Sequence, residues 1–195
     1  MSGTRAVRAI DHIGMTVPDI DEASTFLSAA LGAEVLYDLV GPNAPSGTKE
    51  LKLDLQACLG IRVGTKLEAM RMMRLGEGPC IELFQYSADE QRSAALASDL
   101  GMQHLAVYVD DIDAVQEAIL QAGGSTLAGP NPLPGIEGGD GNRWVYTLAP
   151  WGTIIELITY PSPQGYEKLT NLRRWRPSRA DDAAASSAKS GVVES

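Results

Sequence analysis

Apolar residues follow two different spacings along the chain, and the same succession of spacings occurs in both halves. Short apolar runs rich in strand-forming residues predict strands over residues 12–17, 67–75, 80–86, 104–109, 143–148 and 153–160. In each half, a stretch with helical spacing follows the first of these strands. An aspartate that can cap a helix begins each stretch, and a glycine that can end it follows: Asp19 or Asp21 and Gly32 in the first half, Asp111 or Asp113 and Gly123 or Gly124 in the second.

This recurring order reflects an internal repeat. The ten-residue segments that begin at His12 and His104, 92 residues apart, share five identical residues. Each half then ends on a second common motif, Ile-Glu-Leu-x-x-Tyr, at 81–86 and 155–160. A repeat of this length is typical of a duplicated structural unit. We therefore predict an α+β fold of two βαβββ modules, over residues 8–90 and 100–162.

Three segments fall outside the repeat. The interval between the repeated histidine and glutamate is 70 residues in the first module and 52 in the second, a difference of 18 that we place as an insertion near 41–64. Residues 163–179 form a basic C-terminal extension, which is typical of a solvated face or a subunit contact. Residues 180–195 contain few large apolar side chains, and this composition predicts a disordered tail.

The charge balance narrows the range of partners. The chain of 195 residues has 16 Lys and Arg against 25 Asp and Glu, a formal net charge of -9, which argues against binding to nucleic acids or anionic membranes. It has no apolar run of the roughly 18 residues that a membrane span requires, and no signal-peptide core near its start. Two cysteines are too few for a disulfide framework. We therefore expect a cytoplasmic protein with a small-molecule substrate.

The candidate chemistry lies in four residues that share registers of the repeat. The chain has only two histidines, His12 and His104, and each begins the first strand of a module. Glu82 and Glu156 occupy matching positions in the two closing strands. If the sheets curve toward one another, these side chains converge in one cup as ligands for one divalent ion, which could be Zn, Ni, Co, Mn or Fe. Taken singly, each residue is also typical of a solvated strand position.

Four short motifs in this order and spacing resemble the vicinal oxygen chelate superfamily of glyoxalases, bleomycin-resistance proteins and dioxygenases: residues 11–14, 81–84, 101–106 with 109–111, and 152–157. The resemblance covers about residues 8–162. It implies a glyoxalase-like fold, in which paired βαβββ modules form a cup-shaped, open-barrel-like mixed sheet around a metal ion. It also implies a ligand pattern closest to those of glyoxalase I and methylmalonyl-CoA epimerase: His12, Glu82, His104 and Glu156.

The same resemblance implies an isomerase, epimerase or lyase that removes a proton next to a carbonyl and stabilises an enediolate. Glu156 is the implied base, and Glu68 is a candidate for a second acid or base, although a glutamate there is more often solvent-facing. The substrate is a ketone, a hydroxycarbonyl or a thioester. Arg71 and Arg143 are available to bind glutathione or coenzyme A. An aromatic lining would instead suit the cyclic ketopolyols of 2-epi-5-epi-valiolone-type epimerases, with these substrate-binding candidates: Tyr86, Tyr108 and Tyr146.

Two other functions found in this superfamily stay open. One is a bleomycin-resistance-like protein that binds a small molecule without chemistry, and the other is a metal-dependent extradiol-type dioxygenase. Ligand binding that survives His12→Ala would favour the first, and oxygen consumption would favour the second. Because the module edges and the apolar insertion need to be covered, we also expect a homodimer.

Overall fold

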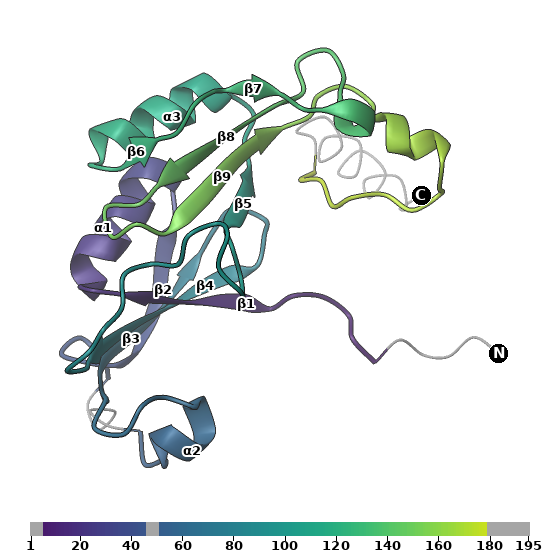
Figure 1. Cartoon of the computed structure of the whole chain (residues 1–195). Coiled ribbons are helices and arrows are strands. Elements are labelled where there is room, and N and C mark those ends of the chain that lie inside the picture. The colour runs from purple at the N-terminus through teal and green to yellow at the C-terminus, as the bar shows by residue number, and fades with distance from the viewer. Residues whose placement is uncertain (1–5, 46–50, 179–195) are drawn as a thin grey trace, which may run out of the picture.

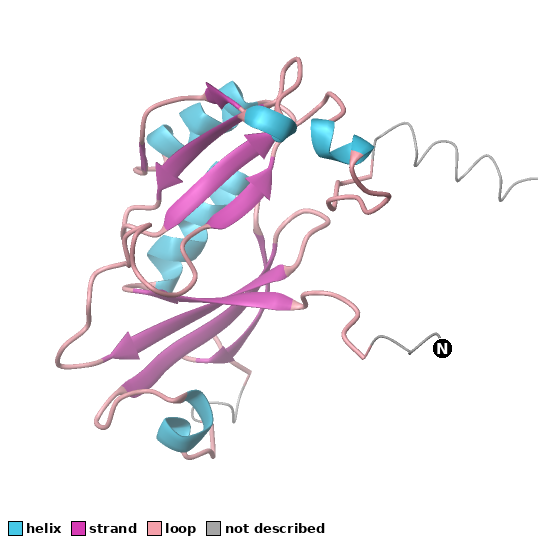
Figure 2. Ribbon diagram, turned by 45° about the vertical axis from the view of Figure 1, so that its right-hand side comes forward, coloured by secondary structure: helices cyan, strands magenta, loops and turns pink. Residues whose placement is uncertain are grey.

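The computed structural model describes residues 6–45 and 51–178 (Figure 1). Two β-sheets stand at an angle to one another, and two long helices lie side by side against them (Figures 1 and 2). The tail predicted over residues 180–195 lies outside the described residues, as does the last residue of the basic extension. In the part of the chain that is described, no helix is both long and apolar enough to cross a membrane.

Each module contributes one sheet with the same topology. The first sheet has the order β1-β4-β3-β2 and contains β1 (His12–Val17), β2 (Glu34–Val40), β3 (Lys66–Arg74) and β4 (Cys80–Ser87). The second has the order β5-β9-β8-β6, with β7 also paired to β8, and contains β5 (Leu105–Tyr108), β6 (Ser125–Thr126), β7 (Asn131–Pro132), β8 (Arg143–Leu148) and β9 (Ile154–Thr159).

The first and last strands of each module pair in parallel, and all other strand pairs are antiparallel. The predicted α+β fold of two βαβββ modules is therefore confirmed, as mixed sheets that do not close into a barrel. The apolar runs did not predict β2. Its side chains do not alternate between a buried and an exposed face, and three successive apolar residues are each about half-exposed: Val35, Leu36 and Tyr37.

The two long helices begin at the predicted caps. The Asp19 carboxylate accepts two backbone N–H groups at 2.9 Å at the start of α1 (Ile20–Leu31), and Asp111 does the same at 3.1 and 3.0 Å for α3 (Ile112–Gln121). Gly32 ends α1 in the left-handed conformation, with φ of 68°. Gly124 follows α3 at a close approach, where an added Cβ would lie 2.7 Å from the Leu148 carbonyl oxygen.

Both helices pack on the same side of the sheets and against each other, so the modules share one core. Strand alternation divides the closing strands between this core and the opposite face. Ile81 and Leu83 on β4, and Ile155 and Leu157 on β9, are fully buried toward the helices. Glu82 and Glu156 therefore point to the face that the helices leave uncovered. Shorter helices lie outside the core: α2 (Leu55–Leu59) within the predicted insertion, η1 (Gly135–Glu137) and η2 (Gly165–Lys168).

Arg71 on β3 ties the first sheet to α1. Its guanidinium donates to both carboxylate oxygens of Asp38 on β2, at 2.6 and 2.9 Å, and to Asp21 and Ser24 on α1, at 2.9 and 2.7 Å. The Arg71 and Asp38 side chains are only 8% and 9% exposed. Hydrogen bonding to Asp38, more than any other interaction, raises the pKa of Arg71 above its ordinary value. The residue is therefore a structural crosslink between two layers.

Replacing Arg71 with methionine should lower the free energy of unfolding by about 3 kcal/mol, because Asp38 would stay buried without its partner. Urea unfolding followed by circular dichroism measures the loss. The control is Arg74→Met, which removes an exposed ion pair with Glu34 and should leave the midpoint nearly unchanged. Equal destabilisation by the two substitutions would contradict this account.

Candidate functional site

The face that the helices leave uncovered carries two histidine–glutamate pairs, one in each module. The distance from His12 Nε2 to Glu82 Oε2 is 3.2 Å, and that from His104 Nε2 to Glu156 Oε2 is 2.9 Å. The two glutamate side chains are only 15% and 14% exposed. Each pair therefore places one imidazole nitrogen and one carboxylate side by side in a partly desolvated position.

The two pairs form for the same reason. On the parallel strands of the first module Gly14 lies opposite Glu82, and on those of the second Ala106 lies opposite Glu156. In both cases the histidine comes two residues before the position opposite the glutamate. A spacing of two keeps both side chains on one face of the sheet. The repeat in the sequence thus becomes a repeat of the same side-chain pair.

The residue before each histidine orients the ring. His12 Nδ1 lies 2.8 Å from Asp11 Oδ2, and His104 Nδ1 lies 2.8 Å from Gln103 Oε1. Assigning the proton to Nδ1 leaves each Nε2 lone pair directed at its glutamate, an arrangement common among metal-binding histidines. The hydrogen bond to Asp11, followed by the charge of Glu82, raises the pKa of His12 above its ordinary value.

Burial raises the pKa of Glu156 above its ordinary value, while the nearby charges of His104 and Arg174 act in the opposite direction. A carboxylate whose pKa is raised by burial is a stronger proton acceptor than an exposed one. Tyr146 stands beside the pair, with its hydroxyl 3.5 Å from His104 Nδ1 and its ring centroid 5.1 Å from the imidazole. Burial, and then the charge of Glu156, raises the pKa of Tyr146.

Aromatic rings cover much of the surface around the pairs. In the first module Phe84 and Tyr86 stack with ring centroids 5.7 Å apart on the same face as Glu82. In the second module the rings of Tyr108 and Tyr160 meet edge to face at 4.8 Å, and Trp144 meets Tyr146 in the same way at 5.0 Å. The three tyrosines predicted from the sequence as substrate-binding candidates therefore all lie on the site side of the sheets: Tyr86, Tyr108 and Tyr146.

A cavity of about 630 Å³ lies between the modules and reaches one of the pairs. His104 lines it from the second module, and Gly14 and Thr16, from the same face of β1 as His12, line it from the first. The connecting segment 91–95 covers part of it. This volume is large enough for a small organic molecule.

The structure keeps the two pairs separate. Among the described residues, no three His, Cys, Asp or Glu side chains are close enough together to hold a metal ion. The four ligands suggested by the resemblance are therefore brought together two by two, on facing parts of the two modules. Their joint role as ligands of one ion stays a prediction.

Two of the predicted substrate contacts are wrong. Arg71 is buried on the helix side of its sheet and bonded to α1, so it cannot reach the uncovered face. Arg143 also points to the helix side, where it forms a bidentate pair with Asp113 of α3 at 2.7 and 3.0 Å. Strand alternation is the reason, because Arg143 shares its face of β8 with the buried Val145. Glu68 is exposed on β3 at a register shift, and its role stays a prediction.

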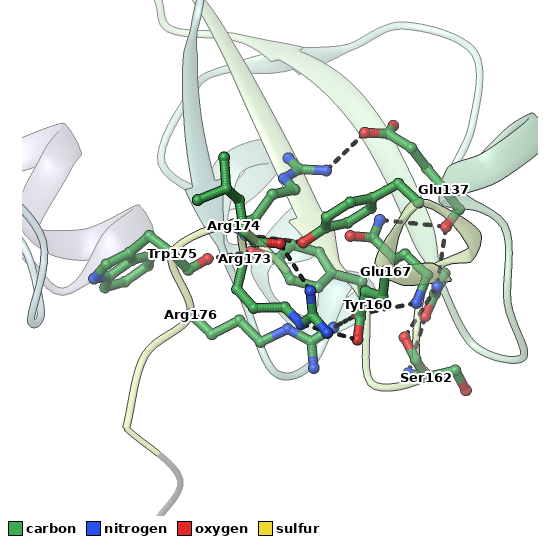
Figure 3. A network of polar contacts seen from close by, with 12 residues as sticks. Glu137, Tyr160, Ser162, Glu167, Arg173, Arg174, Trp175 and Arg176 are labelled. Carbon is green, nitrogen blue, oxygen red and sulfur yellow. Dashed lines mark hydrogen bonds and ion pairs between the residues drawn. The ribbon is translucent and has the colours of Figure 1, made fainter. Parts of the chain in front are cut away.

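Residues of the C-terminal extension reach the site, which the sequence did not indicate. Figure 3 shows Arg174 and Arg176 against the ring of Tyr160, which lies directly after β9. Tyr160 continues the face of β9 that carries Glu156, so these arginines lie at one end of the face that holds the second pair. The available signal was the interleaving of arginines with Tyr166 and Trp175, a pattern that is also common on plain surfaces.

Known proteins share this sequence and architecture. The family model of the glyoxalase/bleomycin resistance protein/dioxygenase superfamily matches residues 11–143. A 2-epi-5-epi-valiolone epimerase from Actinomyces sp. is 38% identical over 172 residues, which are 87% of this chain and 88% of that protein. This similarity supports an enzyme of the isomerase or epimerase class.

Solved structures agree on the fold. A glyoxalase family protein from Bacillus cereus superposes with a TM-score of 0.60 at 16% identity, over 82% of this chain and 97% of that chain. A genomically encoded fosfomycin resistance protein from Listeria monocytogenes superposes with a TM-score of 0.51 at 16% identity, over 79% and 94% of the two chains. At these identities the likeness concerns the fold alone.

Proposed function

Because the chain belongs to the glyoxalase/bleomycin resistance protein/dioxygenase superfamily, we propose that it is a metal-dependent epimerase of a neutral cyclic ketopolyol. The observation that carries the proposal is the matched register of the two His–Glu pairs on the uncovered face. The 38% identical relative named as a 2-epi-5-epi-valiolone epimerase supports that compound, or one with the same ring chemistry, as substrate.

The donor chemistry of the pairs fits a divalent ion. Two imidazole nitrogens and two carboxylates suit Zn, Ni, Co, Mn or Fe, and the residues that would hold the ion are His12, Glu82, His104 and Glu156. The Nδ1 contacts of both histidines favour this use, because they direct each Nε2 toward the site. When bound, the ion supplies Lewis-acid stabilisation of negative charge on a ketone oxygen.

The chain's own residues supply the proton transfer. Glu156 takes the proton from the carbon next to the carbonyl, and its burial favours this role because it raises the pKa of the carboxyl above its ordinary value. The Glu156 carboxylate lies 2.9 Å from His104 Nε2 and the Tyr146 ring packs against the imidazole, so the base has a defined position. Glu156 keeps the abstracted proton, and a second acid, for which Glu68 is the candidate, delivers a proton to the opposite face of the same carbon and inverts its configuration.

The charges around the site favour a neutral substrate. Glutathione and coenzyme A carry carboxylates or phosphates, which are usually bound by free arginine or lysine side chains. Here Arg71, Arg143 and Arg174 each form an ion pair with a carboxylate of the chain itself, whereas Arg92, in the segment that lines the cavity, is exposed and forms no ion pair within the described residues. The aromatic rings beside the pairs provide apolar surface for the faces of a carbocycle. Its hydroxyl groups can be bound by neutral hydrogen-bonding groups, or by charged groups that are already paired within the protein.

We also propose that two copies associate through β2. This strand forms an edge of its sheet, and Val35, Leu36 and Tyr37 along it are each about 50% exposed. Light scattering should then give twice the chain mass of 20.7 kDa, and Tyr37→Glu should shift the mass to that of one chain. A single-chain mass for the unsubstituted protein at micromolar concentration would contradict the dimer.

Metal content tests the ligand set. Purified protein, or protein reconstituted with Zn, Ni, Co, Mn or Fe, should hold about one divalent ion per chain by elemental analysis. His12→Ala should lose most of it because one of four donors is removed. The matched control is Thr16→Ala on the same face of β1, which should keep the ion. An unsubstituted protein that takes up none of these metals would overturn the proposed ligand set.

Solvent exchange tests the base. In D2O the enzyme should place deuterium on the carbon next to the ketone of 2-epi-5-epi-valiolone, and Glu156→Gln should slow this exchange by about 100-fold or more. Metal content is measured on the same samples, so that loss of a ligand is separated from loss of a base. Glu117→Gln, which removes an exposed carboxylate from α3, is the control. Exchange at the normal rate in metal-loaded Glu156→Gln would exclude Glu156 as the base.

A further inference from the structure

Residues 164–178, here called the C-terminal strap, run across one end of both modules. The strap follows β9 and lies away from α1 and α3 (Figure 1). At its far end the Ser178 backbone N–H donates to Glu77, in the turn between β3 and β4 of the first module, at 2.9 Å. A segment outside the repeat thus bridges the two modules on the side of the His–Glu pairs.

The base of the strap is firmly held. Gln164 and Asn142 are almost fully buried, and their side-chain amides both donate to the Glu137 carbonyl oxygen, at 3.3 and 3.0 Å. The Asn142 amide oxygen also accepts from the Ser162 N–H at 3.0 Å. Gly165 passes so close to η1 that an added Cβ would lie 3.2 Å from the Ile136 carbonyl oxygen. These buried hydrogen bonds fix the path of the chain at the base of the strap, and the Gln164 amide oxygen is the one group of this set that has no hydrogen-bond partner among the described residues.

Beyond this base, the strap closes over Tyr160 (Figure 3). The Tyr160 hydroxyl donates to the Trp175 carbonyl oxygen at 2.6 Å, and its ring centroid lies 5.0 Å from the guanidinium carbon of Arg174 and 4.9 Å from that of Arg176. Arg174 also donates to Glu137 at 2.9 Å from its side chain and to the Tyr166 hydroxyl at 2.9 Å from its backbone. The Arg174 side chain therefore has a defined position.

That position lies on the face of the second sheet that carries the second His–Glu pair. Glu156, Ile158 and Tyr160 follow one another on the same face of β9 and its extension, so a group over Tyr160 lies along the row that leads to Glu156. Ile158 and Tyr160 are buried in a cluster with Leu133, and the Arg174 guanidinium lies over the Tyr160 ring at the end of this row.

Only part of the hydrogen-bonding capacity of Arg174 is used. A guanidinium group has five N–H donors, and within the described residues the only side-chain acceptor in contact with it is Glu137, through Nη1. Glu137 also balances the charge, so the remaining donors suit uncharged oxygen atoms better than an anion. We propose that the C-terminal strap forms one wall of the substrate site and that Arg174 binds hydroxyl groups of the substrate there.

This inference rests on the proposed function, because the hydroxyl groups belong to the cyclic ketopolyol. It assigns Arg174 to substrate binding and specificity rather than to proton transfer. Arg173, its neighbour in the strap, is different: its side chain donates to two strap carbonyl oxygens and lies 3.6 Å from Glu167. Arg173 therefore provides a matched control with the same charge and half-exposed side chain.

The experiment compares Arg174→Gln, Arg174→Lys and Arg173→Gln in the full-length, metal-loaded protein with 2-epi-5-epi-valiolone as the probe. Calorimetry gives Kd, and turnover gives KM and kcat separately. Arg174→Gln should raise Kd and KM about tenfold or more while kcat changes little, because charge-assisted hydrogen bonds to the substrate are lost. Arg173→Gln should leave all three constants unchanged.

Arg174→Lys separates binding from folding. Lysine keeps the positive charge opposite Glu137 but lacks the planar set of donors of a guanidinium group. If Arg174 only forms a structural ion pair, Kd should return to the value of the unsubstituted protein. If Arg174 binds the substrate, Kd should stay raised. Normal Kd in Arg174→Gln, full recovery in Arg174→Lys, or no binding of the probe by the unsubstituted protein would each overturn the inference. Binding without turnover would contradict the proposed function alone, and the Kd ratios would still decide the role of Arg174.

Discussion

The parallel pairing between the first and last strands of each module is the contact on which the site depends. It sets the register in which each histidine lies two residues before the position opposite its glutamate. The same strands bury Ile81, Leu83, Ile155 and Leu157 against the helices. A slip of one residue would turn both glutamates into the core, where an unpaired carboxylate is strongly unfavourable. Core packing and site geometry are therefore enforced by the same register.

Charge compensation is the second organising feature. The chain is acidic overall, yet its arginines near the sheets are committed to carboxylates on neighbouring elements, as Arg71 is to Asp38 and Arg143 is to Asp113. The first pair joins two strands and the second joins a strand to a helix, both on the helix side of the sheets, which leaves aromatic rings, histidines and glutamates on the opposite side. We base the proposal of an uncharged, hydroxylated ligand on this composition.

The strap illustrates how a segment outside the repeat can complete a site built by the repeat. Without the strap, the duplicated modules would leave the side chain of Tyr160, at the end of the β9 face that carries Glu156, uncovered. Residues 164–178 cover that end through contacts with Glu137, Tyr160 and Glu77, which come from three separate parts of the chain. None of these contacts is implied by the order of residues in the strap itself, because each depends on where distant elements have already packed.

The sequence by itself determined the duplication, the starts of the two long helices near Asp19 and Asp111, and the four His and Glu residues that share registers of the repeat. These features follow from the local spacing of apolar residues and from motifs that occur at matching positions in both halves of the chain. Tertiary structure alone decided which face each arginine occupies, that the two pairs stay separate within the described chain, and that Arg174 lies over Tyr160. The physical reason is that alternation assigns side chains to one of two faces, whereas the choice between core and site depends on which face the helices cover.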